Sequence, residues 1–244
     1  MRNLYEYNGL VFYDETDINA REYLIHTVSS EIIASLSKGN KAFVSKRIEA
    51  PCLIPCHFIS DEYDLKDIYM ASLDLSLRPE TTASSYNFLK SNLGPLSPPV
   101  CIWQAAKSFR KEQDKTFKNI RFKEFYQLEF QCIYSEGTHF DWYPYLIDVV
   151  FQLFVNLLSV EGTVESIVIE ESDRLPSYSL KTTDIMYNYA TDPMQGADGR
   201  IELCSISHRN DVPFTFWDKK LHNVEIAIGL DRLVYFFTKQ YRSK

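Results

Sequence analysis

Residues 108–134 read SFRKEQDKTFKNIRFKEFYQLEFQCIY, and this stretch decides the fold. Its first residues end one strand, and residues 121–129 form a second strand that returns after a short charged loop. Because side chains alternate along a strand, Arg110 and Glu112 share one face. The second strand presents alternate residues in the same way, namely Phe125, Gln127 and Glu129. The stretch therefore predicts an antiparallel hairpin with a cation, carboxylates and an aromatic ring around one cavity.

This set of groups suits a nucleotide that is bound in a bent shape. A guanidinium group binds phosphate through paired hydrogen bonds. A carboxylate accepts a hydrogen bond from the adenine amino group, and an aromatic ring stacks on the base. A charged, exposed hairpin is the alternative interpretation of this stretch taken alone.

Three other segments strengthen the nucleotide hypothesis. Residues 77–82 (LRPETT) form a turn that carries a carboxylate just after an apolar strand. Residues 201–205 (IELCS) form a strand that brings Glu202 to the same face of the sheet. Residues 225–232 (EIAIGLDR) lead from a strand through a turn into a helix that begins with an arginine. Each segment is weak by itself, but their order along the chain is informative.

The remaining patterns predict helices on both sides of these strands. Apolar spacing favours a helix over residues 18–37, capped by Asp17 and ended by Gly39. Residues 41–50 alternate as a strand does and stop at Pro51. We expect further strands at 68–75, 127–134, 164–170, 199–207 and 224–228, a long helix at 141–159, and a strand-to-helix transition at 226–238. These elements predict an α+β fold, in one domain over residues 1–244, with a mixed and mainly antiparallel sheet flanked by helices.

Composition limits the kinds of protein that this chain can be. Hydrophobic residues make up 45% of its 244 residues, which is enough to bury a core and excludes disorder. The net charge of −7 argues against extensive wrapping by nucleic acid, but not against a small anionic ligand. The N-terminus does not look like a signal peptide, and the apolar segment 149–160 is too short to cross a bilayer. Five cysteines without a disulfide framework favour a reducing, cytoplasmic environment and no membrane association.

In this order, the segments resemble the three motifs of the class II (IIa) aminoacyl-tRNA synthetase catalytic core, most like the glycyl enzymes. Motif 1 would lie around residues 41–53, motif 2 around 108–134 and motif 3 around 224–237. The similarity runs from about Ala42 to Phe237. Twelve residues follow Arg232, so the resemblance also implies a core without the anticodon-binding domain.

The resemblance implies ATP and Mg²⁺ as cofactors and gives particular residues a role. Arg110 would be catalytic and bind the α-phosphate and the substrate carboxylate, while Glu112 would accept from the adenine amino group. Phe125 would stack beneath adenine, and Arg232, also catalytic, would cover its other face and reach the γ-phosphate. Arg121 would add positive charge near the phosphates. Mg²⁺, which prefers hard oxygen ligands, would be held by Glu202 and Ser205.

Glycine is the first choice of amino acid. In the glycyl enzymes three carboxylates converge on the substrate, and Glu80, Glu129 and Glu225 match their positions. An ammonium group has three donors and can be surrounded by such acceptors. The other implied amino-acid contacts are Arg78, Gln127 and Ala227. The chain departs from the glycyl pattern at 226–227, where Ile-Ala replaces Pro-Ser, and at 82–84, and it matches the histidyl enzymes in part.

The resemblance implies activation of a small amino acid to an aminoacyl-adenylate, with release of pyrophosphate. The acceptor would be tRNA or a tRNA-like molecule, another nucleotide or a carrier protein. Two alternatives remain, namely a non-catalytic accessory or binding subunit and an amino-acid ligase with a non-tRNA acceptor. We also expect a two-fold homodimer through motif 1 and the helix at residues 18–37.

Overall fold

A computed structural model of the chain describes residues 5–7, 9–59, 63–92, 96–111, 120–159, 167–175, 179–188, 199–209 and 220–242. In these ranges, seven strands form the central sheet, in the order β3-β6-β7-β11-β10-β9-β8. They are β3 (Val44–Arg47), β6 (Val100–Phe109), β7 (Glu124–Ser135), β8 (Ile167–Glu171), β9 (Ser179–Asn188), β10 (Arg200–Arg209) and β11 (Leu221–Gly229). β3 runs parallel to β6, and the other neighbouring pairs are antiparallel. The predicted α+β fold with a mixed, mainly antiparallel sheet is confirmed.

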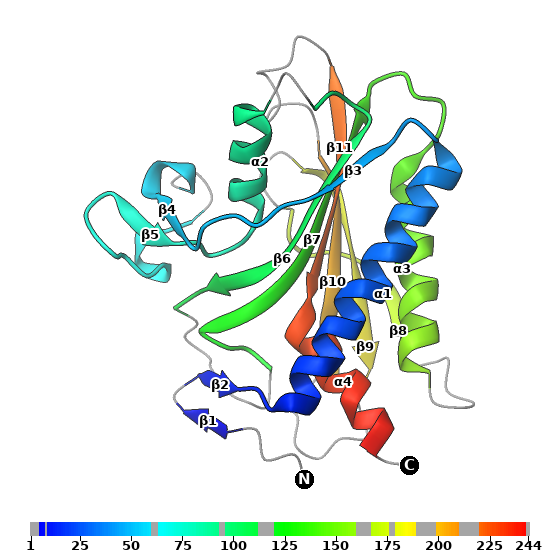
Figure 1. Cartoon of the computed structure of the whole chain (residues 1–244). Coiled ribbons are helices and arrows are strands. Elements are labelled where there is room, and N and C mark those ends of the chain that lie inside the picture. Colours follow the sequence, from blue (N-terminus) through cyan, green and yellow to red (C-terminus); the bar gives the residue numbers. More distant parts are fainter. Residues whose placement is uncertain are drawn as a thin grey trace.

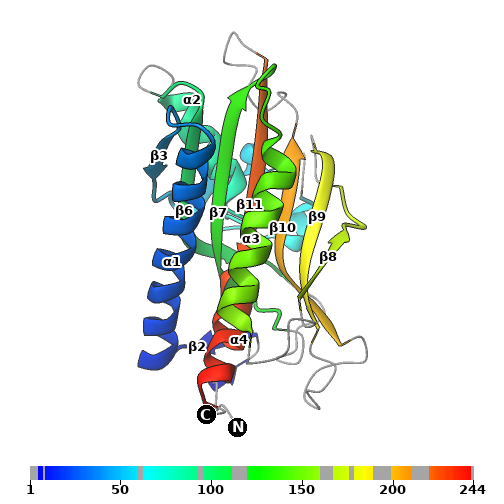
Figure 2. The same cartoon turned by 90° about the vertical axis from the view of Figure 1, so that its right-hand side faces the viewer.

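Helices cover both faces of this sheet, unequally. They are α1 (Glu15–Gly39), α2 (Thr82–Ser91), α3 (Trp142–Leu158) and α4 (Leu230–Arg242). Figures 1 and 2 show α1 and α3 along one face with α4 at its lower end, whereas α2 stands on the other side. The main core fills the space between α1, α3, α4 and the sheet, and a smaller core lies where α2 meets β6.

Two small sheets lie beside the main one. β1 (Tyr5–Tyr7) pairs with β2 (Leu10–Phe12), and β4 (Leu53–Pro55) pairs with β5 (Leu75–Leu77). Short 3₁₀ turns, η1 (Cys56–Phe58) and η2 (Leu65–Asp67), complete the second unit, which projects beside α2 in Figure 1. Among the described residues, no helix has both the length and the apolar character that a membrane span needs.

Strand alternation explains which side chains reach each face. Along β11, Val224, Ile226 and Ile228 are fully buried in the main core with the helices. The intervening Glu225 and Ala227 therefore point to the opposite face, away from α1 and α3. A strand with one apolar and one polar side can be buried on both faces only if the polar side meets partners or a cavity.

Several local predictions were wrong. The strand expected at 68–75 is absent, because Ser72 Oγ accepts from the backbone of Asp74 and Leu75 and bends the chain into a turn before β5. The helix cap is Asp14 instead of Asp17, since the Asp14 carboxylate accepts from the Asp17 amide at 2.9 Å. Helix α2 and strand β9 were not predicted.

Gly39, the last residue of α1, allows the helix to end against the Trp142 indole. A Cβ atom at residue 39 would lie 2.5 Å from the Trp142 ring, which is itself buried. We expect Gly39→Ala to lower the free energy of unfolding by about 1–3 kcal/mol through overpacking. Urea unfolding would measure this loss beside Glu31→Ala, an exposed control on the same helix. Equal stability of the two variants would contradict the expected clash.

Candidate active site

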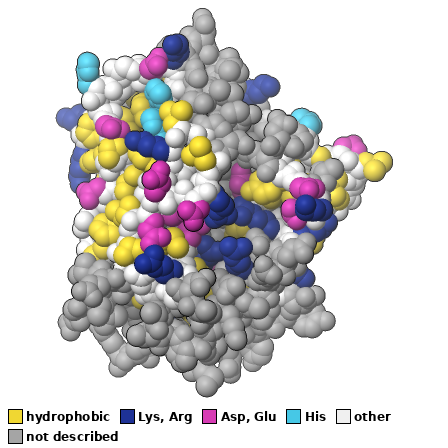
Figure 3. Space-filling model, turned by 180° about the vertical axis from the view of Figure 1, so that it is seen from behind, with side chains coloured by type: hydrophobic (Ala, Val, Ile, Leu, Met, Phe, Trp, Pro, Cys, Tyr) yellow, Lys and Arg dark blue, Asp and Glu magenta, His cyan; other side chains and the backbone are white. Residues whose placement is uncertain are grey.

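A cavity of about 510 Å³ opens on the sheet face that α1 and α3 do not cover. Its walls come from the β6–β7 hairpin, β10, β11, the start of α4 and the segment before α2. Figure 3 shows the molecule from behind relative to Figure 1. Lys and Arg side chains gather there beside Asp and Glu side chains, near the middle of the visible face. A concave site with convergent charged groups is the usual form of a small-ligand site.

Strand register brings the polar residues of this face into rows. Ala227 of β11 lies between Glu129 of β7 and Ser205 of β10. Two residues along the same strand, Glu225 lies between Gln131 and Ser207 in the same way. The two-residue period of the strands thus gathers side chains that are far apart in the sequence.

The structure places most residues of the predicted ATP site around this cavity. Its lining includes Arg110, Arg121, Phe125, Glu202, Ser205 and Arg232. The Arg110 guanidinium carbon lies 5.4 Å from the centre of the Phe125 ring, and Arg110 Nε donates to the Pro79 carbonyl at 2.9 Å. Glu112 lies outside the described residues. The two arginines that the hypothesis depends on therefore share one cavity, while their roles stay predictions.

Gly229, the last residue of β11, leaves room for the Arg232 side chain in this wall. A Cβ at Gly229 would lie only 3.3 Å from Arg232 Cδ. Arg232 Nη1 donates to the Glu202 carbonyl at 2.7 Å, which fixes the side chain along β10.

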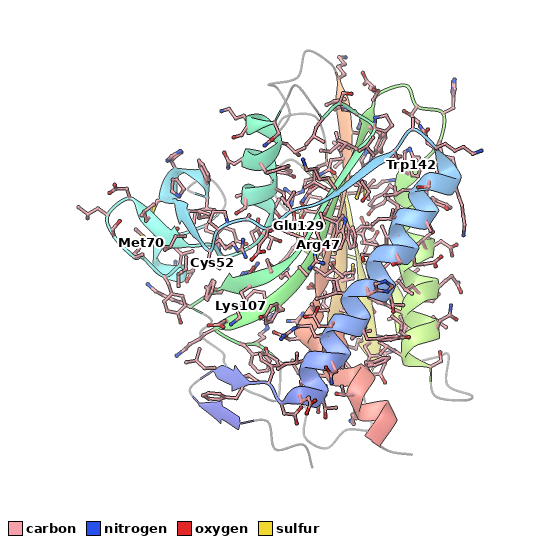
Figure 4. The ribbon with its side chains drawn as sticks, viewed as in Figure 1. Arg47, Cys52, Met70, Lys107, Glu129 and Trp142 are labelled. Atoms are coloured by element: carbon pink, nitrogen blue, oxygen red, sulfur yellow. The ribbon has the colours of Figure 1, made fainter. Side chains whose placement is uncertain are left out.

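The predicted amino-acid site divides into wall residues and residues behind the wall. Four of the six predicted residues line the cavity, and they are Glu80, Gln127, Glu225 and Ala227. Glu80 accepts from the Tyr63 hydroxyl at 2.5 Å and lies 3.6 Å from Arg110 Nη2. Glu129 is buried behind this wall, where it accepts from Ser85 of α2 and Gln104 of β6, and Figure 4 labels it between these elements.

Glu129 and Glu225 form a buried pair of like charges. Gln131 Nε2 donates to both carboxylates, at 2.8 Å to Glu225, and Arg209 Nη2 donates to Glu225 at 2.9 Å. Burial, followed by the negative charge of Glu225, raises the pKa of Glu129 to about 7. Burial also raises the pKa of Glu225, although the Arg209 charge opposes this. Glu80 adds a smaller upward effect on the pKa of each, so the three carboxylates interact electrostatically.

The prediction for Arg78 needs correction, because this side chain does not line the cavity. It is 2% exposed, and its guanidinium donates to the carbonyls of Lys107, Ala50 and Pro51 at 2.7, 2.7 and 3.2 Å. Its Nε and Nη1 donors are therefore used by backbone carbonyls. Arg78 instead joins the end of motif 1 to strand β6 and holds the chain just before Glu80.

Sequence reasoning missed four lining or neighbouring residues. Arg209 follows Ser205 and Ser207 at two-residue spacing, so strand alternation would have found it. Tyr63 precedes η2 in the segment between β4 and β5, and no pattern marks it. The other two are Arg174, in the segment after β8, and Asp184, on β9.

The residues present fit a divalent cation near Glu202 and Ser205. Register pairs Asp184 directly with Ser205, and Asp184 Oδ1 is buried without a hydrogen-bond partner among the described residues. These are hard oxygen donors of the kind that Mg²⁺ prefers. Among the described residues, no group of three or more His, Cys, Asp or Glu side chains is arranged to hold a metal, so hydroxyl or phosphate oxygens would have to complete the coordination.

The chain is similar to several known proteins. The chain is 30% identical over 148 residues to the glycine–tRNA ligase of Mycoplasma mycoides, which covers 60% of this chain and 30% of that enzyme. It is 30% identical over 171 residues to the glycine–tRNA ligase of Mycolicibacterium paratuberculosis, covering 64% and 37%. The crystal structure of prolyl-tRNA synthetase from Cryptosporidium parvum, complexed with halofuginone and AMPPNP, matches 96% of this chain and 48% of that one, with a TM-score of 0.69 and 13% identity. No family model matches the chain.

The fold and these similarities together show that the chain has a class II aminoacyl-tRNA synthetase-like core. Within that class, the sequence relatives described above are glycine–tRNA ligases, as the motif resemblance predicted. The chain spans about a third of the length of these curated relatives, 30% and 37% of the two enzymes. What the complete relatives do is therefore a basis for a proposal about this chain.

The raised pKa of Glu129 predicts a distinctive pH dependence of stability. The folded protein keeps this proton up to about pH 7, whereas an unfolded glutamate releases it near 4.5. The folded state therefore binds more protons in this window, and the contribution of Glu129 to stability falls as the pH rises from 4.5 to 7. Glu129→Gln removes the effect, so its unfolding free energy relative to wild type should rise by about 1–3 kcal/mol between pH 5 and pH 8.

Urea unfolding at several pH values would measure this difference. Glu31→Gln, an exposed glutamate on α1, serves as the control and should run parallel to wild type. A Glu129→Gln curve that is also parallel to wild type would show that Glu129 is charged throughout this range.

Proposed function

We propose that this chain activates glycine with ATP, forms glycyl-adenylate and pyrophosphate, and transfers the glycyl group to an acceptor, tRNA in the first place. The observation that carries the proposal is one cavity whose wall holds Arg110, Arg232 and the carboxylates of Glu80 and Glu225. A wall that carries both guanidinium groups and carboxylates offers partners for a triphosphate and for an ammonium group. Residues 1–244 would act as one catalytic domain, in the cytoplasm, where the five free thiols are stable.

Activation requires two anions to meet. The glycine carboxylate attacks the α-phosphorus of ATP, the bond to the pyrophosphate oxygen breaks, and the electron pair leaves with pyrophosphate. Arg110 would hold the carboxylate and the α-phosphate together and neutralise the charge that develops on the phosphoryl oxygens. Phe125 and Arg232 would enclose the adenine ring, with Arg232 reaching the γ-phosphate. Mg²⁺, held by Glu202 and Ser205, would supply positive charge to the phosphates.

The carboxylates account for the choice of a small amino acid. Glu80 and Glu225 would accept from the ammonium group, and Glu129 would add negative potential from behind the wall once it ionises near pH 7. Gln127 would add a polar contact beside Ala227, which contributes only a methyl group to the floor. A side chain on the substrate would have to enter space lined by these groups and desolvate their charges.

Pyrophosphate exchange tests the proposal directly. We expect glycine, among the twenty amino acids, to support exchange of label between pyrophosphate and ATP. Arg110→Ala should slow this exchange at least about a hundredfold, since it removes charge stabilisation in the transition state. Arg200→Ala, which removes an exposed arginine paired with Glu170, should leave the rate unchanged. Full exchange by Arg110→Ala, or none with any amino acid, would overturn the proposed activity.

We also propose a homodimer through motif 1. β3 lies at the edge of the sheet and all four of its residues are exposed, Val44 to 55%. An exposed edge strand with an apolar side chain is normally covered by a partner. A second copy related by a two-fold axis would cover it, with α1 beside it.

Light scattering on a sizing column tests the dimer. We expect the wild-type chain to elute at twice the mass of one chain, and Val44→Lys to elute as a monomer, because a buried unpaired lysine opposes association. Leu180→Lys on β9 is a matched control, since Leu180 is also 55% exposed, and it should stay dimeric. A monomeric wild type at micromolar concentration would refute this interface.

A further inference from the structure

A second group of charges lies where β8, β9 and β10 border the cavity, apart from the glutamates assigned to the ammonium group. Arg174 Nη2 lies 2.9 Å from Glu202 Oε2. Arg232 Nη1 lies 4.0 Å from Glu202 Oε1. The Glu202 carboxylate, which the proposed function assigns to a divalent cation, thus lies between two guanidinium groups.

Exposure decides which of the two arginines can leave. The Arg174 side chain is 71% exposed, whereas that of Arg232 is 20% exposed and also donates to the Glu202 carbonyl. An exposed ion pair contributes about 1 kcal/mol or less. Breaking the contact of Arg174 therefore costs little, and moving Arg232 would leave a backbone carbonyl without its donor.

Asp184 provides a second carboxylate at the same place. Its partner in the β9–β10 register is Ser205, and one of its oxygens is buried without a hydrogen-bond partner among the described residues. The carboxylates of Glu202 and Asp184 thus lie together with the Ser205 hydroxyl. The exposed Arg174 neutralises their negative charge only in part.

We propose that Arg174 and a divalent cation compete for the Glu202 carboxylate, and that Asp184 is an additional ligand of that cation. This inference rests on the proposed binding of ATP with a divalent cation. A cation beside Glu202 repels the Arg174 guanidinium, and the triphosphate that arrives with the cation attracts it. Arg174 therefore exchanges one anionic partner for another and becomes a phosphate contact.

The exchange predicts opposite effects of one substitution on two ligands. Removing the Arg174 charge takes away a competitor of the cation, so Mn²⁺ alone should bind about threefold to tenfold more tightly to Arg174→Gln. The same variant loses a phosphate contact, so ATP in the presence of Mn²⁺ should bind about threefold to tenfold more weakly. An arginine that merely stabilises the fold would not shift the two affinities in opposite directions.

The test uses the full chain without amino acid, so that no reaction proceeds. Mn²⁺ binding is followed by electron paramagnetic resonance, and ATP binding by calorimetry at fixed Mn²⁺. Asp184→Asn should weaken the binding of Mn²⁺ about tenfold or more. Arg174→Lys keeps the charge and should restore Mn²⁺ binding close to that of wild type.

Matched controls separate local contacts from a general change of charge. Arg200→Gln removes an arginine that pairs with Glu170 outside the cavity wall. Glu171→Gln removes a carboxylate on β8 whose register partner, Thr183, contacts α3 on the opposite face. Both controls should bind Mn²⁺ and ATP as wild type does.

Unchanged or weaker Mn²⁺ binding by Arg174→Gln would overturn the competition, and unchanged binding by Asp184→Asn would remove Asp184 from the site. Failure of the proposed function gives a different result. If Mn²⁺ and ATP bind as described but no amino acid supports pyrophosphate exchange, the cation site stands and glycine activation does not.

Discussion

The constraint on which the site depends is the burial of two carboxyl groups side by side inside one sheet. Glu129 and Glu225 come from neighbouring strands, and Gln131 donates to both, while Arg209 pairs with Glu225. Removing water from two carboxylates costs several kcal/mol each unless donors replace it. Gln131 and Arg209 share this role with Ser85 and Gln104 at Glu129 and with Thr82 and Tyr86 at Glu225, yet the pKa of each carboxyl is still raised. Under the proposed function, a substrate ammonium group beside Glu225 would add a cationic donor to this network.

Hydrogen bonds to backbone carbonyls also position Arg78 and Arg110. Arg78 is buried and donates to three backbone carbonyls, and it fixes the segment from which Glu80 reaches the cavity. Arg110 directly follows β6 and donates to the Pro79 carbonyl, so its position depends on the same segment. Of the two arginines, only Arg110 contributes to the cavity wall. Arg78 thus stabilises the framework, whereas Arg110 lies where the proposed ligand would bind, although both are close to Glu80.

The sequence was sufficient for most strands of the sheet, although not for β9, and for most of the cavity wall, because these follow the two-residue period of the strands. Phe125 and Glu225 could be placed on one face by counting along their strands, and Arg110 and Arg232 follow directly from the ends of β6 and β11. What could not be predicted depends on contacts between segments. Arg78 has the same sequence context whether its guanidinium meets phosphate or backbone carbonyls, and only the fold of 50–51 against β6 decides between them. Asp184 lies on β9, whose mixed polar sequence does not show a strand pattern, so its place beside Ser205 appears only from the register.

The link between the proposed dimer interface and the nucleotide site lies in Asp231, the acidic residue of motif 3. Its Oδ2 accepts from the Tyr126 amide of β7 at 2.8 Å, so it joins the motif 2 strand to the first turn of α4. Burial raises the pKa of Asp231 to about 6, and hydrogen bonds from Tyr126 and Tyr13 oppose the shift. Arg21 of α1 lies over the Tyr126 ring at 4.1 Å and lowers that pKa further. In the proposed dimer, the Arg21–Tyr126 contact would therefore connect a helix beside the interface to the strand that carries Phe125 and to the Asp231 carboxylate at the start of α4.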